Sequence, residues 1–180
     1  MNINLEQSNP IRQAGRRDLM KRVAPAALLA SVALLSEKKA MASTITQASW
    51  VHGSSAQPES TNVGATHYGW GLRITGTTWV HVAIPTPVIV SDRRLSLTKV
   101  SVLYDSDGGS SAALLNVHVY DGGTRIQAWD GVNLKRGFNQ LTLSTPHLMQ
   151  YGAGVSLYLQ PNSASAGPYV ILQGVGGDFI

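Results

Sequence analysis

Hydrophobic and polar residues alternate with a period of two along most of the chain after residue 43. In the clearest run, Val155, Leu157 and Leu159 alternate with serine, tyrosine and glutamine. This alternation is typical of a β-strand with one buried face. Further alternating, β-branched or aromatic runs occupy 78–84, 99–104, 116–120, 125–129, 140–144 and 169–175. The pattern predicts no helix longer than a turn or two in this part of the chain.

Residues that favour turns separate these runs. Asp121-Gly122-Gly123 lies between two alternating runs and is the strongest hairpin signal. Pro85-Thr86-Pro87 is expected to end the run that begins near Thr78, because proline has no backbone N–H to donate. The spacing predicts an all-β fold: a single antiparallel β-sandwich or jelly-roll-like domain of about eight or nine strands.

The first 42 residues have a different pattern. A polar lead and a basic block precede an apolar run of 13 residues, from Val23 to Leu35. That run is too short to cross a hydrocarbon layer of roughly 30 Å as a helix. The polar segment that follows ends in Ala40-Met41-Ala42, two small residues separated by one residue of any type. This order predicts a cleaved signal peptide rather than a membrane anchor.

The paired arginines Arg16 and Arg17 indicate the export route. They are followed by one residue, an apolar pair and Lys21, which resembles the twin-arginine signals of bacteria. We therefore predict a twin-arginine signal peptide at 1–42, with Ala40 and Ala42 forming the cleavage site. The mature β-sandwich domain would be 43–180, exported to the periplasm or secreted, without stable insertion in the membrane.

Removing the predicted signal changes the interpretation of the charge. The chain has a net charge of +4, and residues 1–42 contain seven basic and three acidic residues, which account for all of it. The remaining 138 residues contain seven of each. A neutral domain has no obvious electrostatic surface for a phosphate backbone, so nucleic acid is not a predicted partner. The absence of cysteine excludes disulfides and thiolate chemistry.

Several short motifs in the mature part occur in a fixed order. They are Trp50-Val51-His52-Gly53, Gln57-Pro58-Glu59, Gly69-Trp70-Gly71, Trp79-Val80-His81, Pro85-Thr86-Pro87-Val88-Ile89 and Val117-His118-Val119-Tyr120-Asp121-Gly122. Over roughly 49–131 the chain resembles a bacterial family of small, often exported domains of unknown function. The resemblance implies a single β domain outside the cytoplasm and supplies no catalytic residues.

Enzymatic chemistry has little support in the sequence. There is no Gly-x-Ser-x-Gly motif, no His-x-His and no His-Glu-x-x-His. The aspartates mostly precede turn glycines, where they are expected to bond their own backbone. We predict no cofactor, no bound metal and no catalytic residue. The alternative is a secreted hydrolase or metal-dependent enzyme with an unusual site among His52, His81, His118 and Asp121.

The aromatic residues are the most suggestive feature of the mature domain. Exposed tyrosine and tryptophan rings on a β-sandwich can stack on the CH groups of sugars. Tyr120 and Trp129 are the best candidates, because their neighbours Val119 and Ala128 are expected to face inward. His118 would share a face with Tyr120.

We therefore predict an exported, non-catalytic binding module whose binding residues are Tyr120, Trp129 and His118. Its partner would be an extracellular polysaccharide, an envelope glycan or another protein. Self-association into a homo-oligomer is a variant of this prediction, for which the glycine-rich segment 174–180 would be a docking tail.

Overall fold

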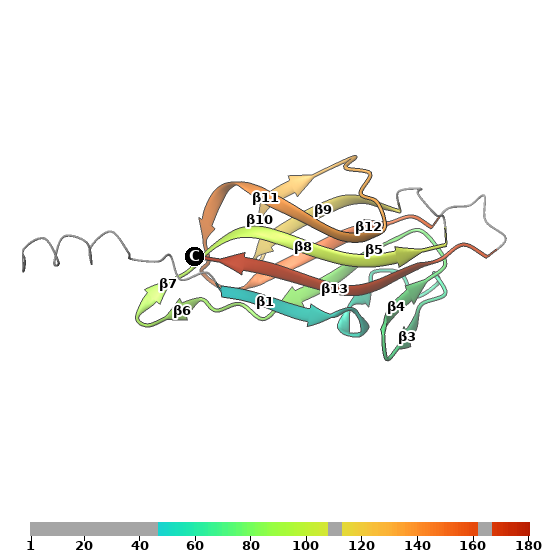
Figure 1. The fold of residues 1–180 in the computed structure, drawn as a ribbon, viewed down its shortest axis with the longest axis horizontal. Helices are drawn as coiled ribbons and strands as arrows, with labels where there is room; N and C mark the ends of the chain where they lie inside the picture. Colours follow the sequence, from blue (N-terminus) through green and yellow to red (C-terminus); the bar gives the residue numbers. More distant parts are fainter. Residues whose placement is uncertain (1–46, 108–112, 162–166) are drawn as a thin grey trace, which may run out of the picture. The chain divides into compact units, whose positions relative to one another are not determined.

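In the computed structural model, antiparallel β-strands make up most of the residues that the structure describes (Figure 1). The structure describes residues 47–107, 113–161 and 167–180, which belong to one compact unit spanning 45–180. The predicted signal at 1–42, with Arg16, Arg17, Ala40 and Ala42, lies outside the described residues and stays a prediction. Within the described residues, no helix is long and apolar enough to cross a membrane.

The first sheet has six strands in the order β11-β8-β13-β4-β3, and β1 pairs with the same edge of β13 as β4 does. Strand β13 is its central element, because β8 pairs along its whole length on one side. The strands are β1 (Gln47–His52), β3 (Thr66–Tyr68), β4 (Gly71–Ile74), β8 (Ser96–Ser106), β11 (Gly137–Leu148) and β13 (Val170–Phe179).

The second sheet has five strands in the order β10-β9-β12-β5-β2. They are β2 (Gln57–Pro58), β5 (Thr78–Ile84), β9 (Leu114–Asp121), β10 (Thr124–Trp129) and β12 (Ala153–Leu159). A small hairpin of β6 (Ile89–Val90) and β7 (Arg93–Arg94) lies in the chain segment that connects β5 of the second sheet to β8 of the first. A short 3-10 turn, η2 (Gly53–Ser55), follows β1.

One hydrophobic core joins the inner faces of the two sheets. Along β12, Val155, Leu157 and Leu159 are at most 1% exposed, while Gly154 and Tyr158 are half-buried and Ser156 is 9% exposed. The same alternation holds in β5 and β9, where the valines at alternate positions are buried. The prediction of an antiparallel β-sandwich is therefore confirmed, and nine of the thirteen strands in the described part have four residues or more.

The predicted turns take the expected places. Asp121 and Thr124 are paired across Gly122-Gly123, which makes the hairpin between β9 and β10. Strand β5 ends at Ile84, immediately before Pro85. These local signals act as the sequence predicts because they depend on backbone chemistry rather than on distant contacts.

The prediction of a docking tail at 174–180 is wrong. Gly174 to Phe179 form the second half of the central strand β13, and Phe179 is fully buried. Ile180 exchanges two backbone hydrogen bonds with Ser96, at 2.8 and 3.0 Å. The glycines here let other groups approach the strand closely, so the segment is part of the core sheet.

Asp121 fixes the turn between β11 and β12 to the end of β9. Its carboxylate is 4% exposed and accepts backbone hydrogen bonds from Gln150 at 2.8 Å, Tyr151 at 2.8 Å and Gly152 at 3.1 Å. His147 Nε2 lies 3.1 Å from the same carboxylate. Burial by itself would raise the pKa of Asp121, but these hydrogen bonds outweigh burial and lower the pKa from 3.8 to about 2.

Because the pKa of Asp121 is lower in the folded protein, its carboxylate stabilises the fold above about pH 4, and the stabilisation is lost as the pH falls towards 2. The difference corresponds to about 2.5 kcal/mol. We expect Asp121→Asn to lower the free energy of unfolding by about 2–3 kcal/mol at pH 7 and to flatten its fall below pH 4. Urea unfolding between pH 2 and 7 measures both effects.

Asp92→Asn is the matched control, since Asp92 is exposed and has a φ of 60°, a conformation that asparagine tolerates. An Asp121→Asn protein with the stability and acid profile of the Asp92→Asn protein would contradict the assignment.

Candidate functional site

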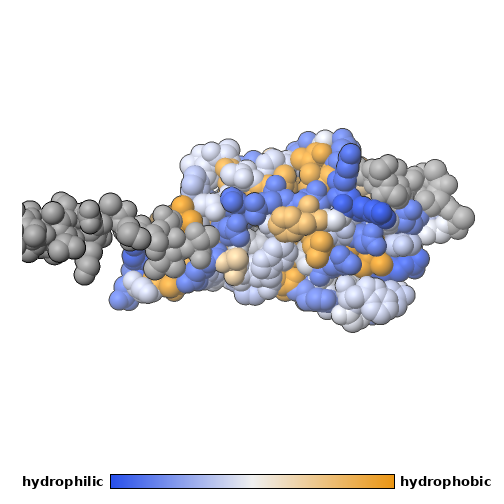
Figure 2. Space-filling model, in the orientation of Figure 1, coloured by the Kyte–Doolittle hydropathy of each residue, from blue (hydrophilic) through white to orange (hydrophobic). Residues whose placement is uncertain are grey.

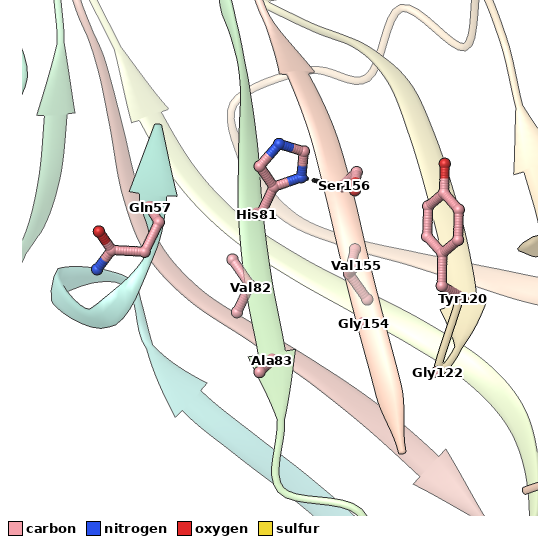
Figure 3. A pocket seen from close by; sticks show the side chains of 9 residues that line it. All are labelled: Gln57, His81, Val82, Ala83, Tyr120, Gly122, Gly154, Val155 and Ser156. Carbon is pink, nitrogen blue, oxygen red and sulfur yellow. Dashed lines mark hydrogen bonds between the residues drawn. The ribbon is translucent and has the colours of Figure 1, made fainter. Parts of the chain in front are cut away.

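The outer face of the five-stranded sheet carries the candidate site. Its central strands β5, β12 and β9 pair so that residues from the three strands form rows across this face. One row consists of Ala83, Gly154 and Tyr120, so two of its three side chains are small or absent. Because Ala83 has a short side chain and Gly154 has none, a hollow of about 500 Å³ lies above this row. Figure 3 shows Gln57 and Tyr120 on opposite sides of this hollow, with Ala83 and Gly154 between them.

The next row is polar. It runs from Gln57 on β2 through His81 and Ser156 to His118, each paired with the next across the sheet. His81 Nδ1 and Ser156 Oγ are 2.9 Å apart (Figure 3), which orients the imidazole, and no described residue forms a hydrogen bond with its Nε2. A histidine held in this way presents one defined nitrogen rather than a mobile ring.

His118 has two partners of its own. Its Nε2 lies 2.7 Å from Asp130 Oδ1, and its ring centroid lies 4.8 Å from that of Trp79 at an interplanar angle of 41°. Trp79 also contacts Tyr158, with the ring centroids 5.2 Å apart. The His118 side chain is 12% exposed. These contacts hold Trp79 and His118 in place beside the polar row.

A second hollow of about 210 Å³ adjoins the first. It is lined by Glu59, Trp79, His81, His118, Tyr120 and Ser156. His81, Tyr120 and Ser156 line both hollows, so the two form one continuous groove across the face. We call this groove the outer groove. Among the described residues that line it, Glu59 is the one carboxylate, and no lysine or arginine is present.

Ser156, His81 and His118 line the outer groove and Asp130 contacts His118 beside it, but these residues do not form a catalytic triad. A triad needs one imidazole between the nucleophile and the carboxylate. Here Ser156 contacts His81, whereas Asp130 contacts His118, so the two pairs are separate.

The backbone around Ser156 is engaged in the sheet. Ser156 lies in the middle of β12, which pairs with β5 on one side and β9 on the other, so the neighbouring backbone N–H groups serve the sheet. An oxyanion site requires such donors to be available to the reacting group.

The four residues predicted for the alternative enzyme site do not come together in one site. His81 and His118 line the outer groove. His52 is on the other sheet, where its Nδ1 accepts a hydrogen bond from the backbone of Ser54, and Asp121 is buried in its turn. In the described parts of the chain, no three His, Cys, Asp or Glu residues are close enough together to hold a metal ion.

Two of the three predicted binding residues share the outer face. Tyr120 and His118 are both on β9 and both line the groove. Trp129 is on the other face, because it pairs with the fully buried Val117 and packs against the core. The predicted platform of Tyr120 with Trp129 therefore does not form.

A β-bulge explains the position of Trp129. The pairing of β10 with β9 shifts between Arg125 and Gln127, so one extra residue, Ile126, enters β10. Since side chains alternate along a strand, one extra residue moves all later side chains to the opposite face. Counting alternation along 125–129 cannot detect this shift.

Trp79 and Ser156 are not among the predicted binding residues, and His81 is predicted only as part of the alternative enzyme site. A signal was present in the run 78–84, where Trp79, His81 and Ala83 alternate with aliphatic residues that fill the core. Their shared outer face follows from that alternation. Their neighbours on the face come from β9 and β12, and strand order is not visible in a sequence.

Comparisons with known proteins give fold neighbours but no relatives. No family model and no curated protein matches the sequence, so the resemblance to a bacterial family stays a prediction. Solved structures with a similar arrangement include the xylan-binding module CBM86 from Roseburia intestinalis, which is 10% identical with a TM-score of 0.47 and covers 76% of this chain and 96% of its own. A CBM36-1 domain of a xylanase from the hindgut metagenome of Trinervitermes trinervoides is 12% identical with a TM-score of 0.42, covering 73% and 96%.

A third neighbour is the carbohydrate-binding module CBM36 in complex with calcium and xylotriose. It is 14% identical with a TM-score of 0.39 and covers 70% of this chain and 96% of its own. At these TM-scores the chains do not superpose closely enough for a site or a ligand to be transferred. These three neighbours are carbohydrate-binding modules.

The position of Trp129 against the core makes it a stability residue. We expect Trp129→Ala to lower the free energy of unfolding by about 2–3 kcal/mol, somewhat less than for a fully buried tryptophan. Tyr120→Ala, which removes a ring from the outer face, is expected to lower it by less than about 1 kcal/mol. Urea unfolding of the two variants at pH 7 compares them directly. Equal losses of stability would contradict the placement of Trp129 on the inner face.

Proposed function

We propose that this protein is a non-catalytic module that binds a neutral glycan chain in the outer groove. The observation that carries the proposal is the combination in one open groove of aromatic rings, fixed hydrogen-bonding side chains and an almost uncharged lining. Each of these features matches one property of a sugar chain.

The aromatic rings provide surfaces for stacking. A pyranose ring presents CH groups on its faces, and these groups pack against the π face of tyrosine or tryptophan. Tyr120 forms one side of the groove, and Trp79 lines its second hollow. The low floor at Ala83 and Gly154 leaves space for a sugar ring beside Tyr120.

The polar row provides hydrogen bonds for hydroxyl groups. A sugar hydroxyl both donates and accepts, so it needs a mixture of donors and acceptors. The Gln57 amide supplies both, His81 supplies its Nε2, and Glu59 supplies acceptor oxygens. Gln57 on β2, His81 on β5 and Glu59, which follows β2, are distributed over the two adjoining hollows, and this favours a chain over a single sugar.

The charge of the lining favours a neutral glycan. A glycan rich in uronic acids or sulfate would meet the Glu59 carboxylate without a lysine or arginine among the described lining residues to balance its own charge. Like charges at short range oppose binding. We therefore assign the ligand to the neutral polysaccharides.

The ring of Tyr120 is the contact to test. We expect the module to bind at least one of xylohexaose, cellohexaose and mannohexaose in calorimetric titrations, and to bind oligogalacturonate more weakly. Tyr120→Ala should weaken binding about tenfold, which corresponds to about 1.4 kcal/mol.

Tyr68→Ala is the matched control, because Tyr68 is a half-buried tyrosine on the other sheet, where it stacks on Trp70. It should leave the affinity unchanged. A folded protein that binds none of the three hexasaccharides, or equal losses in the two variants, would reject the groove as a glycan site. Binding of a protein from the native host that Tyr120→Ala abolishes would then favour a protein partner.

We further propose that the module works outside the cytoplasm after removal of residues 1–42. The support is the order of the basic block with Arg16 and Arg17, the short apolar run and the Ala40-Met41-Ala42 triplet. Replacing Arg16 and Arg17 by lysine keeps the charge but removes the pair that the twin-arginine route reads. We expect this variant to stay in the cytoplasm uncleaved, while Arg12→Lys is exported normally.

The intact mass of the exported protein tests the cleavage site. It should correspond to a chain that begins at Ser43. Normal export of the double lysine variant would exclude the twin-arginine route, and another first residue would move the boundary between the signal and the domain.

A further inference from the structure

Trp50 lies flat on the outer face of the six-stranded sheet. It pairs with Gly176 across β1 and β13, and its indole covers the position that a side chain at Gly176 would occupy. A Cβ built on Gly176 would lie 2.5 Å from Trp50 Cδ2, and one on Gly174 would lie 3.6 Å from Trp50 Cε3. The ring therefore rests across two glycines with one face against the strand, and the residue is 46% exposed.

Phe138 extends this aromatic surface. It lies on β11 in the row that passes from His52 through Gly174 and Leu103. Its ring centroid is 6.1 Å from that of Trp50, the interplanar angle is 34°, and the residue is 60% exposed. Two large rings thus face solvent side by side, and we call them the Trp50–Phe138 platform.

The platform is separate from the outer groove. The inner faces of the two sheets form the core, so their outer faces point away from each other. The groove lies on the five-stranded sheet and the platform on the six-stranded sheet (Figure 1). A ligand on the platform would therefore leave the groove free.

We propose that the Trp50–Phe138 platform is a second glycan site, which binds the flat face of a β-1,4-linked polysaccharide such as cellulose or chitin. In such chains the ring substituents are equatorial, so both faces of each sugar present CH groups to an aromatic surface. Two exposed rings side by side, tilted by 34° to each other, can pack on the exposed sugar faces of an insoluble polysaccharide, whereas the groove matches a single soluble chain. The proposal extends the proposed function and does not depend on the groove.

The area of the platform favours a glycan over a second copy of this chain. The exposed parts of the two rings amount to roughly 200–250 Å², taking each ring at the area that aromatic side chains bury. A stable dimer needs about 800 Å² from each partner. Figure 2 views this sheet and shows small hydrophobic areas separated by polar ones rather than one broad hydrophobic surface. The exposed rings are therefore enough for one or two sugars and too little for a dimer.

The surroundings of the platform also suit hydroxyl groups. Gln140 is on the next row, and its Nε2 donates to Ser101 Oγ at 3.3 Å and to Asp178 Oδ2 at 3.4 Å. Both bonds use the amide nitrogen, so the amide oxygen can accept a hydrogen bond from a sugar. Lys99 lies 4.0 Å from Asp178, so the charges at this edge balance each other. A neutral ligand meets no net charge there.

The test uses the domain from Ser43 onward in pull-down assays with microcrystalline cellulose and with chitin. We expect saturable binding to at least one of them. Trp50→Ala and Phe138→Ala should each weaken it about tenfold or more. Gly176→Ala should do the same although both rings remain, because the added methyl group displaces the indole. Phe138 is 60% exposed, so its replacement tests the platform even if a Trp50 variant folds poorly.

Two controls separate this proposal from the groove. Trp70→Ala removes a tryptophan that is 58% exposed elsewhere on the surface and should bind as the original protein does. Trp50→Ala should keep its affinity for soluble hexasaccharides, which Tyr120→Ala lowers.

No binding to either insoluble polysaccharide, or unchanged binding in Trp50→Ala, Phe138→Ala and Gly176→Ala, would overturn the platform whatever the groove does. A dimer in solution that Trp50→Ala converts to a monomer would also overturn it, in favour of self-association.

Discussion

The pleat of the paired strands is the constraint on which the rest of this structure depends. In β12, each residue that enters the core forces its neighbour onto the outer face, so Val155 and Leu157 determine that Ser156 faces outward between them. Because β5 and β9 pair with β12 in register, their outward residues meet Ser156 on that face. The groove is thus a consequence of core packing in three strands, and its residues need no loop to position them.

Glycine has a structural role on both outer faces. Gly154 lowers the floor of the groove, and Gly176 accepts the indole of Trp50 at a distance that no side chain would permit. Glycine weakens a strand, since it brings no side chain to pack and loses more backbone entropy than other residues. Here the strands concerned are central in their sheets, so hydrogen bonds on both sides compensate for that loss.

Charge is used sparingly and mostly for structure. Asp121 is buried and bound by three backbone amides, and Asp130 orients His118 from the rim of the groove. Asp178 is engaged by Gln140 and Lys99 beside the platform. The two proposed binding surfaces are consequently aromatic and polar but nearly uncharged, a composition that suits neutral sugars better than acidic polymers.

The sequence by itself determined the β-sandwich class, most strand positions, the hairpin at Gly122-Gly123 and the outward direction of Tyr120 and His118. These features depend on residues next to one another in the chain. Only the tertiary structure decided that Trp79, His81 and Ser156 join Tyr120 in a groove, because strand order joins residues far apart in sequence. It also placed Trp129 against the core, since a single extra residue at Ile126 reverses the faces and leaves the hydrophobic pattern unchanged.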